Sequence, residues 1–347
     1  MKVGTARKAA ADWVRRHVIR EDWFRGAYFS GSTVLMEDEV ELPASSDMDV
    51  VVVTAEDDPP AKPGKFLYDG VLLEITFLGQ KQLTSAEVVL TSYHLAGSFR
   101  RNTIIEDPTG LLRRLYEQVS ERFAQRSYVM KRCMDARKRV ENFLQSIDAS
   151  APWHDQVTSW LFATGVTAHV VLVAALRNPT VRLRYVAARE VLLEFAHADL
   201  YEEMLGLLGC REWSPKQTER HLNELARTFD AAASVAQTPF FFRSDITVAA
   251  KPIVIDGSRG LIKDGFHREA VFWMVATFAR CHKILAADAP HLERIYAPAF
   301  EAAVTGLGIE TKEDLLRRAD GVRQFLPRLW SAAEDIIHKH PEVIHPL

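Results

Sequence analysis

The hydrophobic pattern of this chain changes once, at Asp107-Pro108, and does not change back. Before this point, short apolar runs are separated by turn residues, as in strands. After it, apolar residues recur at the three- and four-residue spacing of helices. The pattern predicts an α+β protein, with a small mixed-sheet domain over residues 1–107 and an all-α helical domain over residues 108–347. A length of 347 residues agrees with two domains.

The first block is predicted to be a small sheet with one or two helices. A helix covers about residues 5–20, and a short strand ends at a tight turn at Gly31-Ser32. A run of high β-propensity follows at residues 47–54. A loop at residues 57–64 then leads into two apolar runs joined at Asp69-Gly70, a dipeptide favoured in two-residue hairpins.

The second block is predicted to be helical almost throughout. Helical periodicity runs from about residue 112 to 147, and residues 238–260 are expected to be irregular or briefly extended. Further helices are expected to begin at Pro152, Pro179, Ser214-Pro215, about Asp264, and Thr311.

One uncharged run, residues 157–176, is long enough to span a membrane. Its threonines, its glycine and His169 favour a buried core helix instead, in which His169 would be hydrogen-bonded. Three isolated cysteines without a Cys-x-x-Cys pair argue against disulfides and a structural zinc site. The first twenty residues lack the apolar core of a signal peptide. We therefore expect a cytoplasmic protein without a membrane partner.

The charge of the chain disfavours a nucleic-acid partner. The formal net charge is −3, and the basic residues are spread along the sequence. There is no basic field of the kind that drives general binding to nucleic acids.

Three carboxylates are predicted to meet at one point of the sheet. Asp47 and Asp49 lie two residues apart at the start of a strand and therefore project from the same face. Glu74 is the single charge in the second hairpin strand, on the face opposite to Val71, Leu73, Ile75 and Phe77. With no basic residue near them in the sequence, paired strands would make these carboxylates repel unless a divalent cation lay between them. Such oxygen ligands suit magnesium.

The turn at Gly31-Ser32 precedes these carboxylates in the chain. A glycine lets the backbone approach a phosphate closely, and a serine adds a hydroxyl and an amide. Arg100 follows the sheet block and could reach a triphosphate.

The order of these motifs, SGS…SSDMDVVVV…LLEITFL, resembles the nucleotidyltransferase superfamily with the polymerase-β-like fold. It is similar in particular to the aminoglycoside adenylyltransferases, whose small sheet domain is also followed by an all-helical domain. The resemblance covers roughly residues 25 to 80. The connection from Ser32 to Asp47 is longer than in those relatives and carries acidic residues at positions 37–41.

The resemblance implies a role for each motif residue. Asp47 and Asp49 match the metal-binding pair, and Glu74 matches the third carboxylate, which is a metal ligand and the candidate base. Two magnesium ions are expected there. Gly31 and Ser32 match the turn that contacts the nucleotide phosphates. Ser46 and Arg100 are further candidates for nucleotide binding.

The resemblance also implies a reaction. The chain would transfer a nucleoside monophosphate, AMP from ATP by default or another NTP, to a hydroxyl of a small molecule such as an aminoglycoside-like antibiotic. Pyrophosphate would leave, and the helical domain would bind the acceptor across an interdomain cleft. Alternatives are a nucleotidyltransferase acting on a protein or an RNA end, and a non-catalytic nucleotide-binding or antitoxin-like protein. The oligomeric state stays open, with a homodimer among the alternatives.

Each candidate also has a simpler structural interpretation. Asp47 and Asp49 could be solvated at the start of a strand, and Glu74 and Arg100 could be surface residues. The acidic run at residues 37–41 is more simply a solvated loop, with a docking surface for a polycationic substrate as the alternative.

Overall fold

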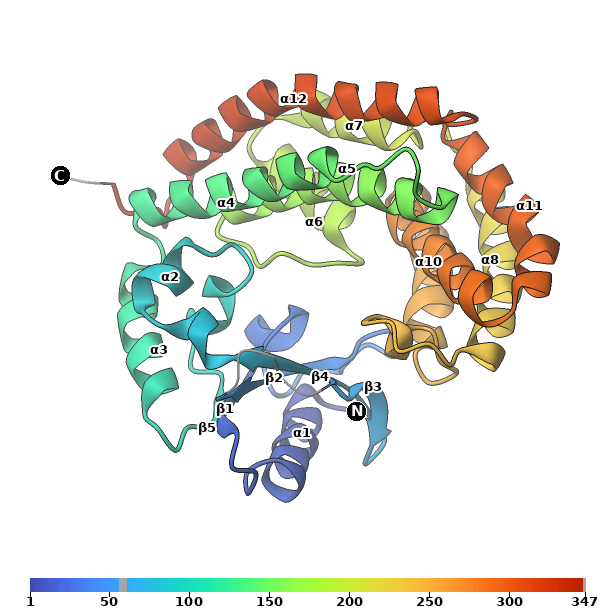
Figure 1. Cartoon of the computed structure of the whole chain (residues 1–347). Coiled ribbons are helices and arrows are strands. Elements are labelled where there is room, and N and C mark those ends of the chain that lie inside the picture. Colours follow the sequence, from blue (N-terminus) through green and yellow to red (C-terminus); the bar gives the residue numbers. More distant parts are fainter. Residues whose placement is uncertain (56–60, 346–347) are drawn as a thin grey trace. The chain divides into compact units, whose positions relative to one another are not determined.

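The computed structural model describes residues 1–55 and 61–345, which form two compact units (Figure 1). The first unit comprises Met1–Arg132, Leu176–Pro179 and Glu342–Leu347. The second comprises Cys133–Ala175 and Thr180–Pro341. The first unit continues beyond residue 107, the boundary predicted from the sequence.

Within the described residues, five strands form one mixed sheet in the first unit. They are β1 (Phe24–Phe29), β2 (Met48–Thr54), β3 (Gly64–Tyr68), β4 (Val71–Gly79) and β5 (Ile104–Glu106). The order across the sheet is β3-β4-β2-β1-β5, with β2 and β4 parallel and the other neighbours antiparallel. All of these strands precede residue 107, and helices predominate in the rest of the described chain, so the predicted α+β class is confirmed.

Helix α1 (Val3–His17) covers one face of this sheet (Figure 1). Its apolar side packs against every second residue of the central strands, because successive strand side chains point to opposite faces. The buried partners on the sheet include Met48, Val50, Val52, Leu73 and Ile75. The residues between them therefore project from the face opposite to α1.

The hairpin predicted at Asp69-Gly70 joins β3 to β4. Both turn residues have positive φ, 46° and 74°, as in a two-residue type I′ turn. The turn fixes a register that runs from Tyr68 opposite Val71 to Lys65 opposite Glu74. Of the loop predicted at residues 57–64, residues 57–60 lie outside the described residues.

Helices complete the first unit after β4. They are α2 (Ala86–Thr91), α3 (Leu111–Arg122) and the beginning of α4 (Arg126–Gln145), with 3-10 turns at Gln80–Leu83 and Ala96–Phe99. Helix α3 packs against α2 and the second 3-10 turn, which explains why the unit extends past residue 107.

The second unit contains the remainder of α4 and the helices that follow it. They are α5 (Trp153–Ala174), α6 (Arg184–Glu194), α7 (Ala198–Leu208), α8 (Pro215–Val235), α9 (Gly257–Lys263), α10 (His267–Asp288), α11 (Pro290–Gly306) and α12 (Lys312–Lys339). Ser214 caps α8, and Thr311 with Asp314 forms a capping box on α12, as their spacing predicts.

Two expectations for the second unit are wrong. The helix expected from Pro179 begins at Arg184, because Leu176–Pro179 belongs to the first unit. The second half of residues 238–260 is helical and not extended, with a π-helical turn at Pro252–Asp256 that leads into α9. The apolar residues of this turn are buried by neighbouring helices, so it needs no strand partner.

Helices α5 and α10 are long and apolar enough to cross a membrane by length and composition alone. Their most apolar stretches are 83% and 78% buried inside the protein, as in the core helices of a soluble protein. His169 on α5 is buried, and its Nε2–H donates to the Thr180 carbonyl at 3.0 Å, as predicted.

Candidate active site

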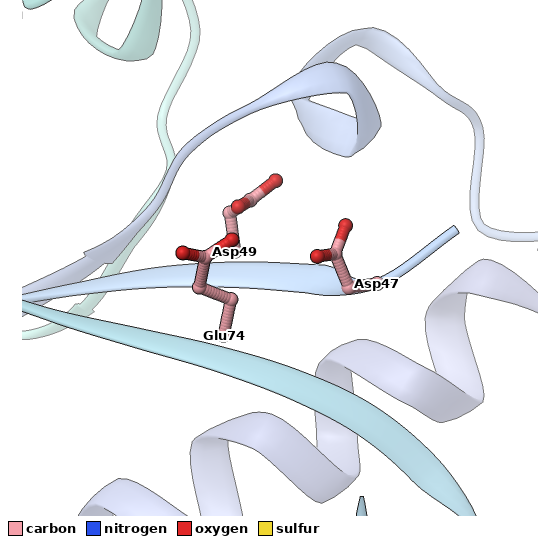
Figure 2. A group of neighbouring side chains, drawn as sticks. All are labelled: Asp47, Asp49 and Glu74. Atoms are coloured by element: carbon pink, nitrogen blue, oxygen red, sulfur yellow. The ribbon is translucent and has the colours of Figure 1, made fainter. Parts of the chain in front are cut away.

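The three predicted carboxylates lie together on the face of the sheet opposite to α1 (Figure 2). Strands β2 and β4 are parallel, and their register places Asp49 directly opposite Glu74. Asp47 directly precedes β2 and projects to the same side. One carboxylate oxygen from each residue lies within 4.8 Å of the other two.

The carboxylates are partly buried. The side chain of Asp47 is 17% exposed and that of Glu74 is 20% exposed, so neither is the freely solvated surface residue of the simpler interpretation. Partly buried carboxylates need a nearby positive charge or a proton.

A lysine that is distant along the sequence supplies part of that positive charge, so a divalent cation is not the only way to offset the repulsion between the carboxylates. Lys65 lies on β3 opposite Glu74, forms an ion pair with it, and places Nζ 2.7 Å from Asp47 Oδ2. Its side chain is only 9% exposed. Lys62 Nζ lies 3.4 Å from Glu74 Oε1. The metal-free cluster is therefore partly neutralised by the protein itself.

The pKa values of the two facing carboxyl groups, Asp49 and Glu74, are shifted in opposite directions. Burial raises the pKa of Asp49 well above its ordinary value, and the charges of Asp47 and Glu74 raise it further, against the effect of Lys65. Burial would also raise the pKa of Glu74, but Lys65 and Lys62 outweigh it and lower that pKa. Asp49 is therefore harder to deprotonate than a free aspartate, whereas Glu74 is easier to deprotonate than a free glutamate.

The turn after β1 packs directly on Asp49. Gly31 has a φ of 72°, and a Cβ added to it would lie 1.8 Å from Asp49 Oδ2. The Ser30 amide donates to the Asp49 carbonyl at 3.0 Å. Ser32 is exposed and begins a 3-10 helix, η1 (Ser32–Leu35). The glycine is thus required both for its backbone angle and for the space beside the carboxylate.

The long connection between Ser32 and Asp47 is held against α1. Arg7 on α1 donates to the carbonyls of Thr33 and Met36 and forms an ion pair with Asp38. Further ion pairs of the acidic run join Glu37 to Arg101, Glu39 to Lys2, and Glu41 to the amino group of Met1. The run is a surface loop whose charges are already paired.

The remaining two residues predicted to bind the nucleotide, Ser46 and Arg100, lie in different surroundings. Ser46 lies in the turn that precedes Asp47, and its amide donates to the Pro43 carbonyl at 2.9 Å. Arg100 donates to the Leu176 carbonyl at 2.9 Å and forms an ion pair with Glu342 at 2.6 Å. These contacts join Arg100 to the outlying segments of the first unit, and not to the three carboxylates.

Three carboxylates at this spacing could hold a divalent cation. Carboxylate oxygens are the hard ligands that magnesium prefers, and Mg²⁺ requires few of them because it keeps water or phosphate at its other positions. Lys65 occupies oxygens of two of the three groups, so a cation would compete with it.

Comparison with known proteins does not assign the chain to a family. No protein-family model and no curated protein matches the chain. A function is therefore inferred from the acidic cluster and its surroundings.

Proposed function

We propose that this chain is a magnesium-dependent nucleotidyltransferase. It would transfer a nucleoside monophosphate, AMP from ATP by default, to a hydroxyl of a small molecule such as an aminoglycoside-like compound. The observation that carries the proposal is the convergence of Asp47, Asp49 and Glu74 within 4.8 Å, beside a glycine turn that packs on Asp49.

The chemistry assigns a role to each carboxylate. Bound magnesium would orient the triphosphate and stabilise the charge that develops at the α-phosphorus. Asp47 and Asp49 would hold the metal, and Glu74 would contact it and accept the proton of the acceptor hydroxyl. The acceptor oxygen forms a bond to the α-phosphorus, the bond from that phosphorus to the bridging oxygen breaks, and pyrophosphate leaves.

The turn beside the carboxylates suits a phosphate. Ser32 is exposed at the start of η1, and Gly31 has no side chain to block an approach. Ser46 directly precedes the metal-binding pair. We assign these three residues to the triphosphate.

A second candidate is a non-catalytic nucleotide-binding protein. The observation that favours it is Lys65, which offsets part of the negative charge of the cluster. A protein of this kind would bind a nucleotide but would not turn it over.

The test is a screen for pyrophosphate release by the full chain with Mg²⁺ and each NTP. Acceptor panels would contain aminoglycosides, other hydroxylated small molecules, proteins and RNA. Support would be release that EDTA abolishes, together with an acceptor heavier by one nucleoside monophosphate. Nucleotide binding without release from any panel would favour the second candidate.

The screen needs two variants as controls. Combining Asp47→Asn with Asp49→Asn removes the metal-binding pair and should abolish turnover. Glu87→Gln makes a similar carboxyl-to-amide change at an exposed residue that pairs with Lys131 and should leave turnover unchanged. Turnover that persists in the double variant would refute the assignment of the site.

A further inference from the structure

Lys65 lies where a bound cation would need oxygen ligands. Its ammonium group contacts Asp47 and Glu74, which are two of the three carboxylates in the cluster. When Asp49 is ionised, the three carboxylates outnumber the ammonium groups of Lys65 and Lys62, so net negative charge remains to attract a cation. The ammonium and a divalent cation cannot both use the same oxygens, and as like charges they repel at this distance.

The Lys65 side chain is mostly buried and held by two ion pairs, so its release requires that it exchange these partners for others. Strand β3 lies at the edge of the sheet, so Lys65 has a single neighbouring strand, β4. A lysine carries a compact charge on a flexible four-carbon stem, and its three donors accept new partners without fixed geometry. A nucleotide bound at the cluster would bring phosphate oxygens within reach of such a stem.

We propose that Lys65 is a tethered counter-cation of the acidic site, which leaves Asp47 and Glu74 when a metal–nucleotide complex binds and then contacts the triphosphate. The inference rests on the proposed function, since it assumes that the cluster takes a metal and a nucleotide. Lys65 would then make metal binding depend on the nucleotide. A metal that binds alone displaces the ammonium from two carboxylates and offers it no new partner, whereas a metal that binds with a nucleotide brings phosphate oxygens that the ammonium can contact.

This dependence is a coupling between the two ligands. Metal and nucleotide should each bind more tightly in the presence of the other, and by the same factor. Removal of the ammonium should tighten binding of the metal alone and weaken the coupling.

The experiment measures Mn²⁺ binding to the full chain by electron paramagnetic resonance, with and without a non-hydrolysable ATP analogue. In the wild type, the analogue should tighten Mn²⁺ binding by a factor within the roughly 5- to 150-fold range of such couplings. In Lys65→Met, Mn²⁺ alone should bind about tenfold more tightly than in the wild type, and the analogue should tighten its binding by a smaller factor than in the wild type. Lys65→Arg keeps the charge and should retain weak binding of Mn²⁺ alone.

The matched control is Lys62→Met. It removes the same charge from the same neighbourhood, but Lys62 makes only the longer contact to Glu74. Its effect on Mn²⁺ binding should therefore be clearly smaller than that of Lys65→Met, and the coupling should persist. Lys65→Gln, which keeps hydrogen-bonding capacity, replaces Lys65→Met if circular dichroism shows that the methionine variant does not fold.

The inference would be overturned if the wild type and the neutral Lys65 variant bound Mn²⁺ alone equally tightly, or if the coupling between Mn²⁺ and the analogue were the same in both. It would also be overturned if Lys62→Met changed Mn²⁺ binding as much as the Lys65 substitution does. Failure of every one of these proteins to bind Mn²⁺ would overturn it as well. Because every readout is binding, the result does not depend on turnover. A protein that shows the coupling but releases no pyrophosphate would support the role of Lys65 and contradict the proposed enzymatic function.

Discussion

The space where Gly31 lacks a side chain is filled by the carboxyl group of Asp49. A Cβ on Gly31 would lie 1.8 Å from Asp49 Oδ2, closer than any real contact between such atoms. The turn after β1 and the carboxylate at the head of β2 therefore hold each other in place. This pairing links the glycine turn to the acidic cluster more directly than their spacing in the sequence indicates.

Gly31→Ala should reduce turnover much more than its cost in stability would explain. The substitution displaces the Asp49 carboxyl, and a displacement of about 1 Å can cost roughly 10²-fold in rate. The matched control is Gly70→Ala, because Gly70 has a similar φ of 74° but only Met1 Cε near its added Cβ, at 3.7 Å. Gly70→Ala should lose about 1–2 kcal/mol from its left-handed backbone, measured by urea unfolding. Gly31→Ala should lose more, because its φ of 72° and ψ of −156° lie in a region that is essentially restricted to glycine. Equal turnover in the two variants would contradict the role of the Gly31–Asp49 contact.

Glu74→Gln should lower the rate of transfer by roughly 10²- to 10⁴-fold, because the amide cannot accept the proton of the acceptor hydroxyl. Binding of the nucleotide analogue should change far less. Single-turnover kinetics and analogue titrations measure the two effects separately. A Glu74→Gln variant with wild-type turnover would rule out this residue as the base.

Without metal, Asp49→Asn should be more stable than the wild type, and this difference should grow as the pH rises. Because the pKa of Asp49 is raised well above its ordinary 3.8, the folded protein holds this proton more tightly than the unfolded chain. Stability from this group is therefore present at low pH and is lost as the pH rises from 3.8 through the folded pKa. The difference in melting temperature between Asp49→Asn and the wild type should grow along that range in EDTA.

Asp47→Asn is the contrasting variant for that experiment. Asp47 forms an ion pair with Lys65, so its replacement removes a favourable contact and should not stabilise the protein. A melting temperature that falls with Asp49→Asn and rises with Asp47→Asn would reverse this assignment of charges.

His169 should make the protein sensitive to acid. Burial among apolar helices lowers its pKa from 6.5 to about 3, so its contribution to stability is complete above pH 6.5 and is lost as the pH falls toward 3. At about pH 5 the loss should be about 2 kcal/mol. His169→Gln keeps a donor for the Thr180 carbonyl but does not titrate, so urea unfolding should show a correspondingly smaller loss between neutral pH and pH 5. The exposed His291→Gln is the control, and an equal change in both variants would contradict this explanation.

The sheet could be predicted because local signals agreed with each other. The valine run favoured a strand, and the Asp69-Gly70 turn fixed the alternation of β4, so Glu74 had to lie opposite the buried face. The parallel pairing of β2 with β4 then brought Asp49 to Glu74.

Lys65 was missed although the same turn contains the signal for it. A two-residue hairpin pairs residues at equal distances from the turn, and Lys65 and Glu74 are such a pair. Separation along the chain concealed this proximity, whereas the register would have revealed it. The contact of Gly31 with Asp49 had no comparable signal, because it depends on the path of the turn in space.

The helical part was less predictable where packing overrides local preference. Helical periodicity identified α3 but could not show that it packs in the first unit. Pro179 has the chemistry of a helix start, yet the chain there belongs to the first unit, and α6 begins at Arg184.

The most direct test of the central claim is the anomalous scattering of Mn²⁺ in crystals of the full chain grown with the non-hydrolysable ATP analogue. The account predicts a Mn²⁺ peak at the carboxylate oxygens of Asp47 and Asp49, next to Glu74, with the analogue's phosphates beside Gly31-Ser32 and Lys65 withdrawn from the carboxylates. An ordered analogue bound elsewhere, or an analogue beside these residues with no Mn²⁺ at the carboxylates, would contradict it.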